Sequence, residues 1–174
     1  LDFELDAGKR LILVTSHRRE NFGEPFRQIC QALRILAERN PDVQLLYPVH
    51  PNPNVRDVAY QLLGQVSNVQ LCAPLDYPQF VAAMSRAYLI VSDSGGVQEE
   101  APALGVPVLV LRDETERPEA VSAGVVKLVG PHVDTITAEA QQLLDDETSY
   151  AAMSQGVSPY GDWHAAERII RVLQ

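Results

Sequence analysis

The sequence has 174 residues, of which 46% are hydrophobic and only 6% aromatic, and its formal net charge is −9. This length and composition predict one globular domain over residues 1–174, and the abundance of Val, Leu, Ile and Ala is typical of a parallel sheet covered by helices. The acidic balance excludes a general nucleic-acid or anionic-membrane binder, because such partners require clustered lysine and arginine.

Cysteine and histidine usage bears on redox chemistry and metal binding. Cys30 and Cys72 each lie within an apolar pattern, so we expect buried thiols in a reducing cytoplasm rather than a disulfide. The four histidines are scattered without paired spacing, which predicts no zinc site. No apolar run approaches the roughly 18 residues of a membrane span, and we expect neither a membrane segment nor a signal peptide. The chain begins with Leu1 and not with Met, so we expect a fragment of a longer protein.

Short apolar runs alternate with amphipathic stretches along the chain. In chain order they predict strand 10–15, helix 25–39, strand 43–49, helix 55–64, strand 69–72, helix 77–87, strand 88–93, helix 96–105, strand 106–111, strand 125–130 and helices 136–146, 149–155 and 163–174. Strands that alternate with helices predict an α/β fold with one doubly wound parallel sheet, Rossmann-like in type. Ligands of such sheets bind at the carboxyl ends of the strands. The candidate site therefore lies in the polar loops 16–24, 50–54, 73–80, 92–96 and 112–119.

The loop SDSGG (92–96) joins a predicted strand to a predicted helix. The first N–H groups of a helix lack partners and the helix dipole favours negative charge there, so phosphate is a suitable ligand. Gly95 and Gly96 leave the backbone open to a ligand, and we expect Ser94 to cap the helix and to offer its hydroxyl. A plain tight turn with a serine cap fits the same residues equally well. The spacing matches neither G-x-G-x-x-G nor a P-loop, which disfavours NAD binding and ATP hydrolysis.

Two glutamates follow the glycines by about one helical turn. A carboxylate at this distance lies too far along the helix to oppose the phosphates, but it can accept hydrogen bonds from a ribose diol. Glu100 is the candidate for that contact, whereas we expect Glu99 to face solvent.

Basic side chains follow the first and fifth predicted strands. In SHRREN (16–21), His17 stands beside two arginines and can act as a donor or acid toward a phosphate leaving group, with a solvated basic loop as the alternative. After the fifth strand, Arg117 can bind a diphosphate with both arms of its guanidinium, or it can pair with Glu116 or Glu119.

Four stretches carry a resemblance to a known family: VTSHRREN (14–21), YPVHPNPNVR (47–56), VSDSGGVQEEAPALGVPVLVLRDETERPE (91–119) and SPYGD (158–162). In this order, over nearly the whole chain, they resemble the non-hydrolysing UDP-N-acetylglucosamine 2-epimerases. Members of that family have two Rossmann-like domains of the GT-B type, and the chain resembles the C-terminal one. The resemblance implies reversible inversion at C2 of the sugar, by elimination and re-addition of UDP, without a metal or other cofactor.

The resemblance also implies a role for each matching residue. His17 would lie in the catalytic cleft near the phosphates and the sugar. Arg18 and His50 match positions that contact a second UDP-N-acetylglucosamine, which acts as an allosteric activator. In the UDP site, the serine and the glycine pair would hold the diphosphate, the glutamate the ribose and the phenylalanine the uracil. The residues implied to bind UDP are Leu75, Phe80, Ser94, Gly95, Gly96, Glu100 and Arg117.

The sequence departs from the family pattern in small ways at Ser16, Glu114 and Trp163 and in one large way. The N-terminal domain, whose carboxylates act at the sugar C2, is absent, so we expect the isolated chain to be inactive. The implied partners are UDP-N-acetylglucosamine, UDP and the protein's own N-terminal domain, in a cytoplasmic homodimer of the full-length protein. A GT-B glycosyltransferase, a hydrolysing epimerase and a non-catalytic UDP-sugar sensor remain as alternatives.

Overall fold

The sheet is the centre of the fold. A computed structural model describes residues 5–156, 158–161 and 164–173 of the chain. Its strands are β1 (Arg10–Thr15), β2 (Val43–Pro48), β3 (Val69–Cys72), β4 (Leu89–Ser92), β5 (Val108–Val110) and β6 (Val126–Leu128). All neighbouring strands are parallel, in the order β3-β2-β1-β4-β5-β6. The predicted doubly wound parallel sheet is confirmed.

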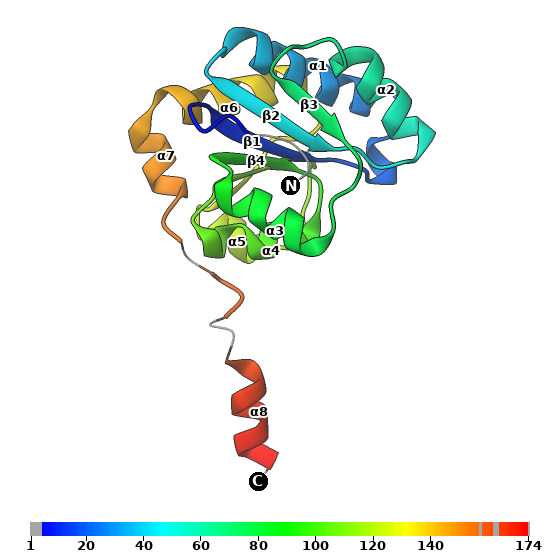
Figure 1. Cartoon of the computed structure of the whole chain (residues 1–174). Helices are drawn as coiled ribbons and strands as arrows, with labels where there is room; N and C mark the ends of the chain where they lie inside the picture. Colours follow the sequence, from blue (N-terminus) through cyan, green and yellow to red (C-terminus); the bar gives the residue numbers. More distant parts are fainter. Residues whose placement is uncertain (1–4, 157, 162–163, 174) are drawn as a thin grey trace.

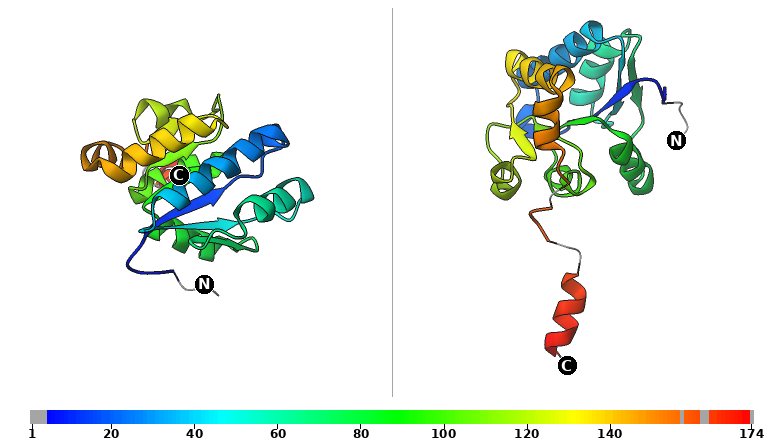
Figure 2. Two further views of the ribbon diagram at one scale, coloured as in Figure 1. Left: turned by 90° about the horizontal axis from the view of Figure 1, so that it is seen from above. Right: turned by 90° about the vertical axis from the view of Figure 1, so that its left-hand side faces the viewer.

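Helices cover both faces of this sheet (Figures 1 and 2). On one face lie α1 (Glu24–Arg39), α2 (Pro53–Leu63) and α6 (Val133–Asp145). On the other face lie α3 (Tyr77–Arg86), α4 (Gly95–Glu100) and α5 (Pro118–Ser122). The chain continues into α7 (Glu147–Met153) and α8 (Ala165–Leu173).

The core consists of two apolar clusters, one on each face of the sheet. Successive side chains of a strand point to opposite faces, and β1 is buried on both. Ile12 and Val14 therefore pack in the cluster beneath α1, whereas Leu11 and Leu13 pack in the cluster on the α3 side. This burial holds β1 at the centre of the sheet, so the loop that follows it has a rigid base.

The predicted helix 96–105 is wrong in its extent. The structure has the short helix α4, then a 3-10 turn at Pro102–Leu104 and a left-handed Gly105 (φ 73°). Proline has no N–H to donate and its ring crowds the preceding turn, so Pro102 prevents α4 from continuing. Strands 106–111 and 125–130 are shorter than predicted. Two short helices were not predicted at all: α5 and a 3-10 turn at Arg19–Asn21.

The last helix, α8, extends away from the rest of the domain (Figure 1). It carries four exposed apolar side chains, namely Ile169, Ile170, Val172 and Leu173. Some positions named in the sequence analysis lie outside the described residues. They are Leu1, Asp162 at the end of SPYGD, Trp163, and Gln174 at the end of the predicted helix 163–174. Within the described part of the chain, no helix is both long and apolar enough to cross a bilayer.

Candidate functional site

Three loops meet at the carboxyl edge of the sheet. They follow β1, β4 and β5, which are neighbours in the sheet, with Thr15 of β1 paired with Ser92 of β4. The strand order reverses between β1 and β4, and a doubly wound sheet binds its ligands at such a point. The fold therefore brings the predicted 16–24, 92–96 and 112–119 loops together.

Asp93 holds the loop after β1 in place. Its side chain is completely buried. The carboxylate accepts hydrogen bonds from the Ser16 hydroxyl (2.9 Å), the backbone N–H groups of His17 (3.0 Å) and Arg18 (2.9 Å), and the side-chain amide of Asn21 (3.1 Å). A buried carboxylate with this many donors needs no counter-ion, because hydrogen bonds replace its lost hydration.

The start of α4 is open to a ligand. Ser94 occupies the N-cap position but makes no capping hydrogen bond, so the prediction that it caps the helix is wrong. Its own N–H donates to the Ser92 hydroxyl at 2.9 Å. One guanidinium nitrogen of Arg18 and one of Arg117 each lie 3.6 Å from the point that a Cβ on Gly95 would occupy. Two positive groups from different loops therefore lie over Gly95, which is buried, next to the exposed Gly96.

Arg117 forms an ion pair with Glu99 across the loop after β5. The prediction that Glu99 faces solvent holds in part, because its side chain is 40% exposed but also pairs with Arg117. Among the described residues, neither Glu116 nor Glu119 is the carboxylate partner of Arg117. Hydrogen bonding and the negative charge of Glu99 raise the pKa of Arg117. Pairing leaves one arm of the guanidinium turned toward Gly95.

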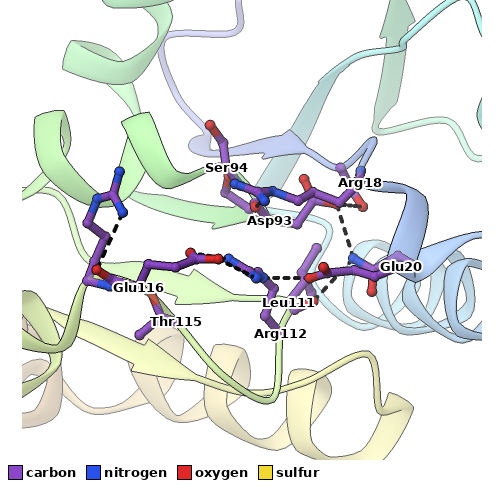
Figure 3. A network of polar contacts seen from close by, with 12 residues as sticks. Arg18, Glu20, Asp93, Ser94, Leu111, Arg112, Thr115 and Glu116 are labelled. Atoms are coloured by element: carbon purple, nitrogen blue, oxygen red, sulfur yellow. Dashed lines mark hydrogen bonds and ion pairs between the residues drawn. The ribbon is translucent and has the colours of Figure 1, made fainter.

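Arg112 connects the loops after β1 and β5 (Figure 3). It pairs with Glu20 at 2.5 Å and with both carboxylate oxygens of Glu116, at 2.6 and 2.9 Å. These bonds lower the pKa of Glu116 to about 2. The sequence contains no local signal for this contact with Glu20, because the two residues are 92 positions apart.

The predicted base-binding residues lie at the start of α3, Leu75 in the loop before it and Phe80 in its first turn rather than in the predicted loop 73–80. Leu75 and Phe80 are half-buried and pack against the apolar cluster on that face. A reciprocal pair of hydrogen bonds between Asp76 and Gln79 caps α3 and fixes the loop. The Tyr77 hydroxyl donates to a Glu100 carboxylate oxygen at 3.2 Å, and the charge of Glu100 raises the pKa of Tyr77. Tyr77 was not predicted as a site residue, although it is an exposed aromatic in a strand-to-helix loop.

His17 and His50 lie together beside the start of α4. Their rings stack with centroids 5.5 Å apart and 12° between their planes. The Nδ1 of His50 accepts a hydrogen bond from the Asn52 N–H at 3.1 Å. Both histidines line a hollow of about 400 Å³, whose other lining residues are Arg18, Arg19, Phe22, Asn52 and Ser94.

All ten predicted site residues thus lie on the carboxyl side of the sheet, in two groups. His17, Arg18 and His50 gather near the start of α4, where Ser94, Gly95, Gly96 and Arg117 also lie. Leu75, Phe80 and Glu100 belong to the α3 side, where Tyr77 links the loop to Glu100. Among the described residues, no group of three or more histidine, cysteine or acidic side chains is placed to hold a metal ion. Cys30 and Cys72 are free thiols, and burial raises the pKa of Cys30 to about 12.

A family profile described as UDP-N-acetylglucosamine 2-epimerase matches residues 2–174. The chain belongs to this family. The UDP-N-acetylglucosamine 2-epimerase of Campylobacter jejuni is 54% identical over 172 residues, which are 99% of the chain and 45% of that protein.

Solved structures of epimerases agree with this assignment. The Neisseria meningitidis UDP-GlcNAc 2-epimerase bound to UDP-GlcNAc is 46% identical with a TM-score of 0.93, and the match covers 97% of the chain and 46% of that protein. The Methanocaldococcus jannaschii UDP-GlcNAc 2-epimerase in complex with UDP-GlcNAc and UDP is 30% identical with a TM-score of 0.79, covering 96% and 46%. The chain therefore spans about half the length of the epimerases that it matches.

Proposed function

We propose that the chain is the UDP-binding, C-terminal half of a UDP-N-acetylglucosamine 2-epimerase that interconverts UDP-GlcNAc and UDP-ManNAc. The observation that carries this proposal is the convergence of Arg18 and Arg117 on Gly95 at the start of α4, beside the exposed Gly96. Charge-assisted hydrogen bonds from guanidinium groups suit a diphosphate, and unpaired backbone N–H groups at a helix start add to the attraction. The N. meningitidis relative, which has UDP-GlcNAc bound, supports the same ligand class.

The nucleotide would extend from α4 toward α3. Its diphosphate would lie on Ser94, Gly95 and Gly96, with Arg117 above them. The ribose diol would donate to Glu100, one turn further along α4. The uracil would lie against Phe80, with Leu75 nearby. The contact between Tyr77 and Glu100 supports this direction, because it connects the ribose position to the start of α3, where the base-binding residues lie.

The chain's part in the reaction would be to stabilise UDP as it leaves and to retain it for re-addition. A base removes the C2 proton while the bond to UDP breaks, and negative charge builds up on the departing diphosphate. Fixed N–H and guanidinium donors stabilise such charge without reorganising. His17 would face the phosphates and the sugar from the loop after β1. The groups that move the C2 proton would come from the N-terminal domain.

A second UDP-N-acetylglucosamine would bind as an activator through His50 and Arg18, and the Arg18 guanidinium would then lie between the two ligands. Support comes from the hollow that these two residues share with Ser94, which adjoins the proposed diphosphate position. The two ligands would then be neighbours, so that occupancy of one site affects the charge and packing at the other.

The whole protein would pair this chain with its own N-terminal domain and act as a cytoplasmic homodimer, making a precursor for surface polysaccharides. Coverage of about 45% of the relatives supports the missing domain. Two free cysteines support a reducing compartment.

Incubation of the full-length protein with UDP-N-acetylglucosamine in D2O tests this function. We expect deuterium at C2 and formation of the manno epimer as a UDP-sugar. Free N-acetylmannosamine would indicate a hydrolysing epimerase instead. Sugar transfer to an acceptor without deuterium uptake would indicate a GT-B glycosyltransferase, and binding without turnover a UDP-sugar sensor.

A further inference from the structure

The segment from Asp93 to Glu100 carries two polar side chains that are completely buried, Asp93 and Gln98. Burial of a polar side chain is unfavourable unless hydrogen bonds replace its contacts with water. Both side chains are hydrogen-bonded, and each reaches a different neighbouring loop. Their hydrogen-bond partners show which loops the two side chains hold in place.

Asp93 connects to the loop after β1. The Asp93 carboxylate accepts a hydrogen bond from the backbone N–H of Arg18. The Asp93 backbone carbonyl accepts a second one from the Arg18 Nε at 3.0 Å (Figure 3). Asn21 extends the connection, because its side-chain amide donates both to the Asp93 carboxylate and to the Leu111 carbonyl, at 3.2 Å. Asp93 thus holds both the backbone and the guanidinium of Arg18 by hydrogen bonds.

Gln98 connects to the loop after β5. Its amide nitrogen donates to the Ser94 carbonyl at 3.2 Å, and its oxygen accepts from the Thr115 hydroxyl at 2.6 Å. The same Thr115 oxygen accepts a hydrogen bond from the backbone N–H of Arg117 at 3.0 Å. A continuous chain of hydrogen bonds therefore runs from Ser94 through Gln98 and Thr115 to Arg117.

We propose that Asp93 and Gln98 are positioning residues, which set the two arginines at the correct places over Gly95. The inference rests on the proposed UDP site and deepens it, since neither buried side chain touches the ligand position itself. Site groups need support within a fraction of an ångström, and buried hydrogen-bonded side chains supply it. Asp93 places Arg18 together with His17, whereas Gln98 places Arg117 through Thr115.

Thr115 provides the sharpest test, because its hydroxyl can be removed with little change of shape. In the full-length protein, Thr115→Val should raise the Kd of UDP and the KM of UDP-N-acetylglucosamine about fivefold, the effect of losing one hydrogen-bonded link. The unfolding temperature and kcat should change little. Thr115→Ser keeps the hydroxyl and should restore both constants. Thr137→Val, a matched loss of a hydroxyl within α6, should leave them unchanged.

Asp93→Asn tests the other connection. It keeps the shape of the side chain but removes the charge that four donors share, and we expect kcat/KM to fall about tenfold or more. Wild-type binding by Thr115→Val, or equal loss in the Val and Ser variants, would overturn the role of Gln98. Wild-type kcat/KM in Asp93→Asn would overturn that of Asp93. If the wild-type protein itself binds no UDP, the proposed function fails together with the inference.

Discussion

Glu99 and Glu100 are adjacent carboxylates with different partners. Glu99 pairs with Arg117, whereas Glu100 accepts from the Tyr77 hydroxyl. Glu99 therefore supplies negative charge to an arginine that a diphosphate would also attract. Glu100 lies on the side of α4 that faces the proposed ribose and base positions.

Substitution of the two glutamates one at a time separates these roles. We expect Glu100→Gln to weaken UDP binding about tenfold, because a ribose diol donates more strongly to a charged acceptor. Glu99→Gln should change the Kd no more than about twofold, because two effects oppose each other. Arg117 loses the carboxylate that competes with the diphosphate, but it also loses the ion pair that holds its guanidinium in place. Titration calorimetry with UDP measures both. Equal effects would remove the ribose assignment from Glu100.

Individual site residues were predicted best where their role follows from residues next to them in the sequence. The glycine pair and the serine before it are visible as a strand-to-helix junction, and Arg117 as a cation beside it. The partners of these residues were not predictable in the same way. Ser94 was expected to cap α4, yet its hydroxyl makes no such bond. Asn21 and Gln98 form hydrogen bonds with residues of other loops, and these partners are far away in the sequence. Their neighbours in sequence therefore give no sign of these contacts.

At the scale of elements, the six strands and the longer helices were predicted because apolar runs of a buried parallel sheet differ plainly from amphipathic helices. The break at Pro102 was missed because the apolar pattern continues through it, although proline has no N–H for the helix. The strand order places the loops after β1, β4 and β5 side by side. Their contacts then follow from topology rather than from spacing.

The ion pairs of Arg112 join two of these loops and predict a pH dependence. The pKa of Glu116 is lowered from 4.5 to about 2, so its pairing contributes fully above about pH 4.5 and is lost as the pH falls toward 2. We expect the unfolding temperature of Glu116→Gln to fall less steeply than that of the wild type between these values. Glu114→Gln, an exposed neighbour, should keep the wild-type slope. Identical slopes for wild type and Glu116→Gln would contradict the role of this pair.

At the scale of the whole molecule, the proposed function makes the chain one wall of a two-domain cleft. It spans about 45% of the C. jejuni relative, and the proposed site lies at an open edge of the sheet. Under the proposed function, the site residues described above would bind and orient a nucleotide, while the C2 chemistry would belong to the other half. The exposed apolar face of α8 also belongs to this scale, because it has no covering element among the described residues.

The isolated chain therefore should bind UDP weakly and catalyse no epimerisation. Under the proposed function, the N-terminal domain would supply the rest of the cleft and the groups that move the C2 proton. Calorimetry gives the affinity, and proton NMR of UDP-N-acetylglucosamine incubated with the chain gives the turnover. Substantial turnover by this chain alone would refute the division of labour between the two halves.

The location of the nucleotide is the claim on which the whole account depends. A crystal structure of the full-length protein with UDP tests it most directly. We predict the diphosphate on Ser94, Gly95 and Gly96 within reach of Arg117, and the ribose diol on Glu100. A nucleotide bound away from the start of α4, or bound there with its ribose far from Glu100, would contradict the account.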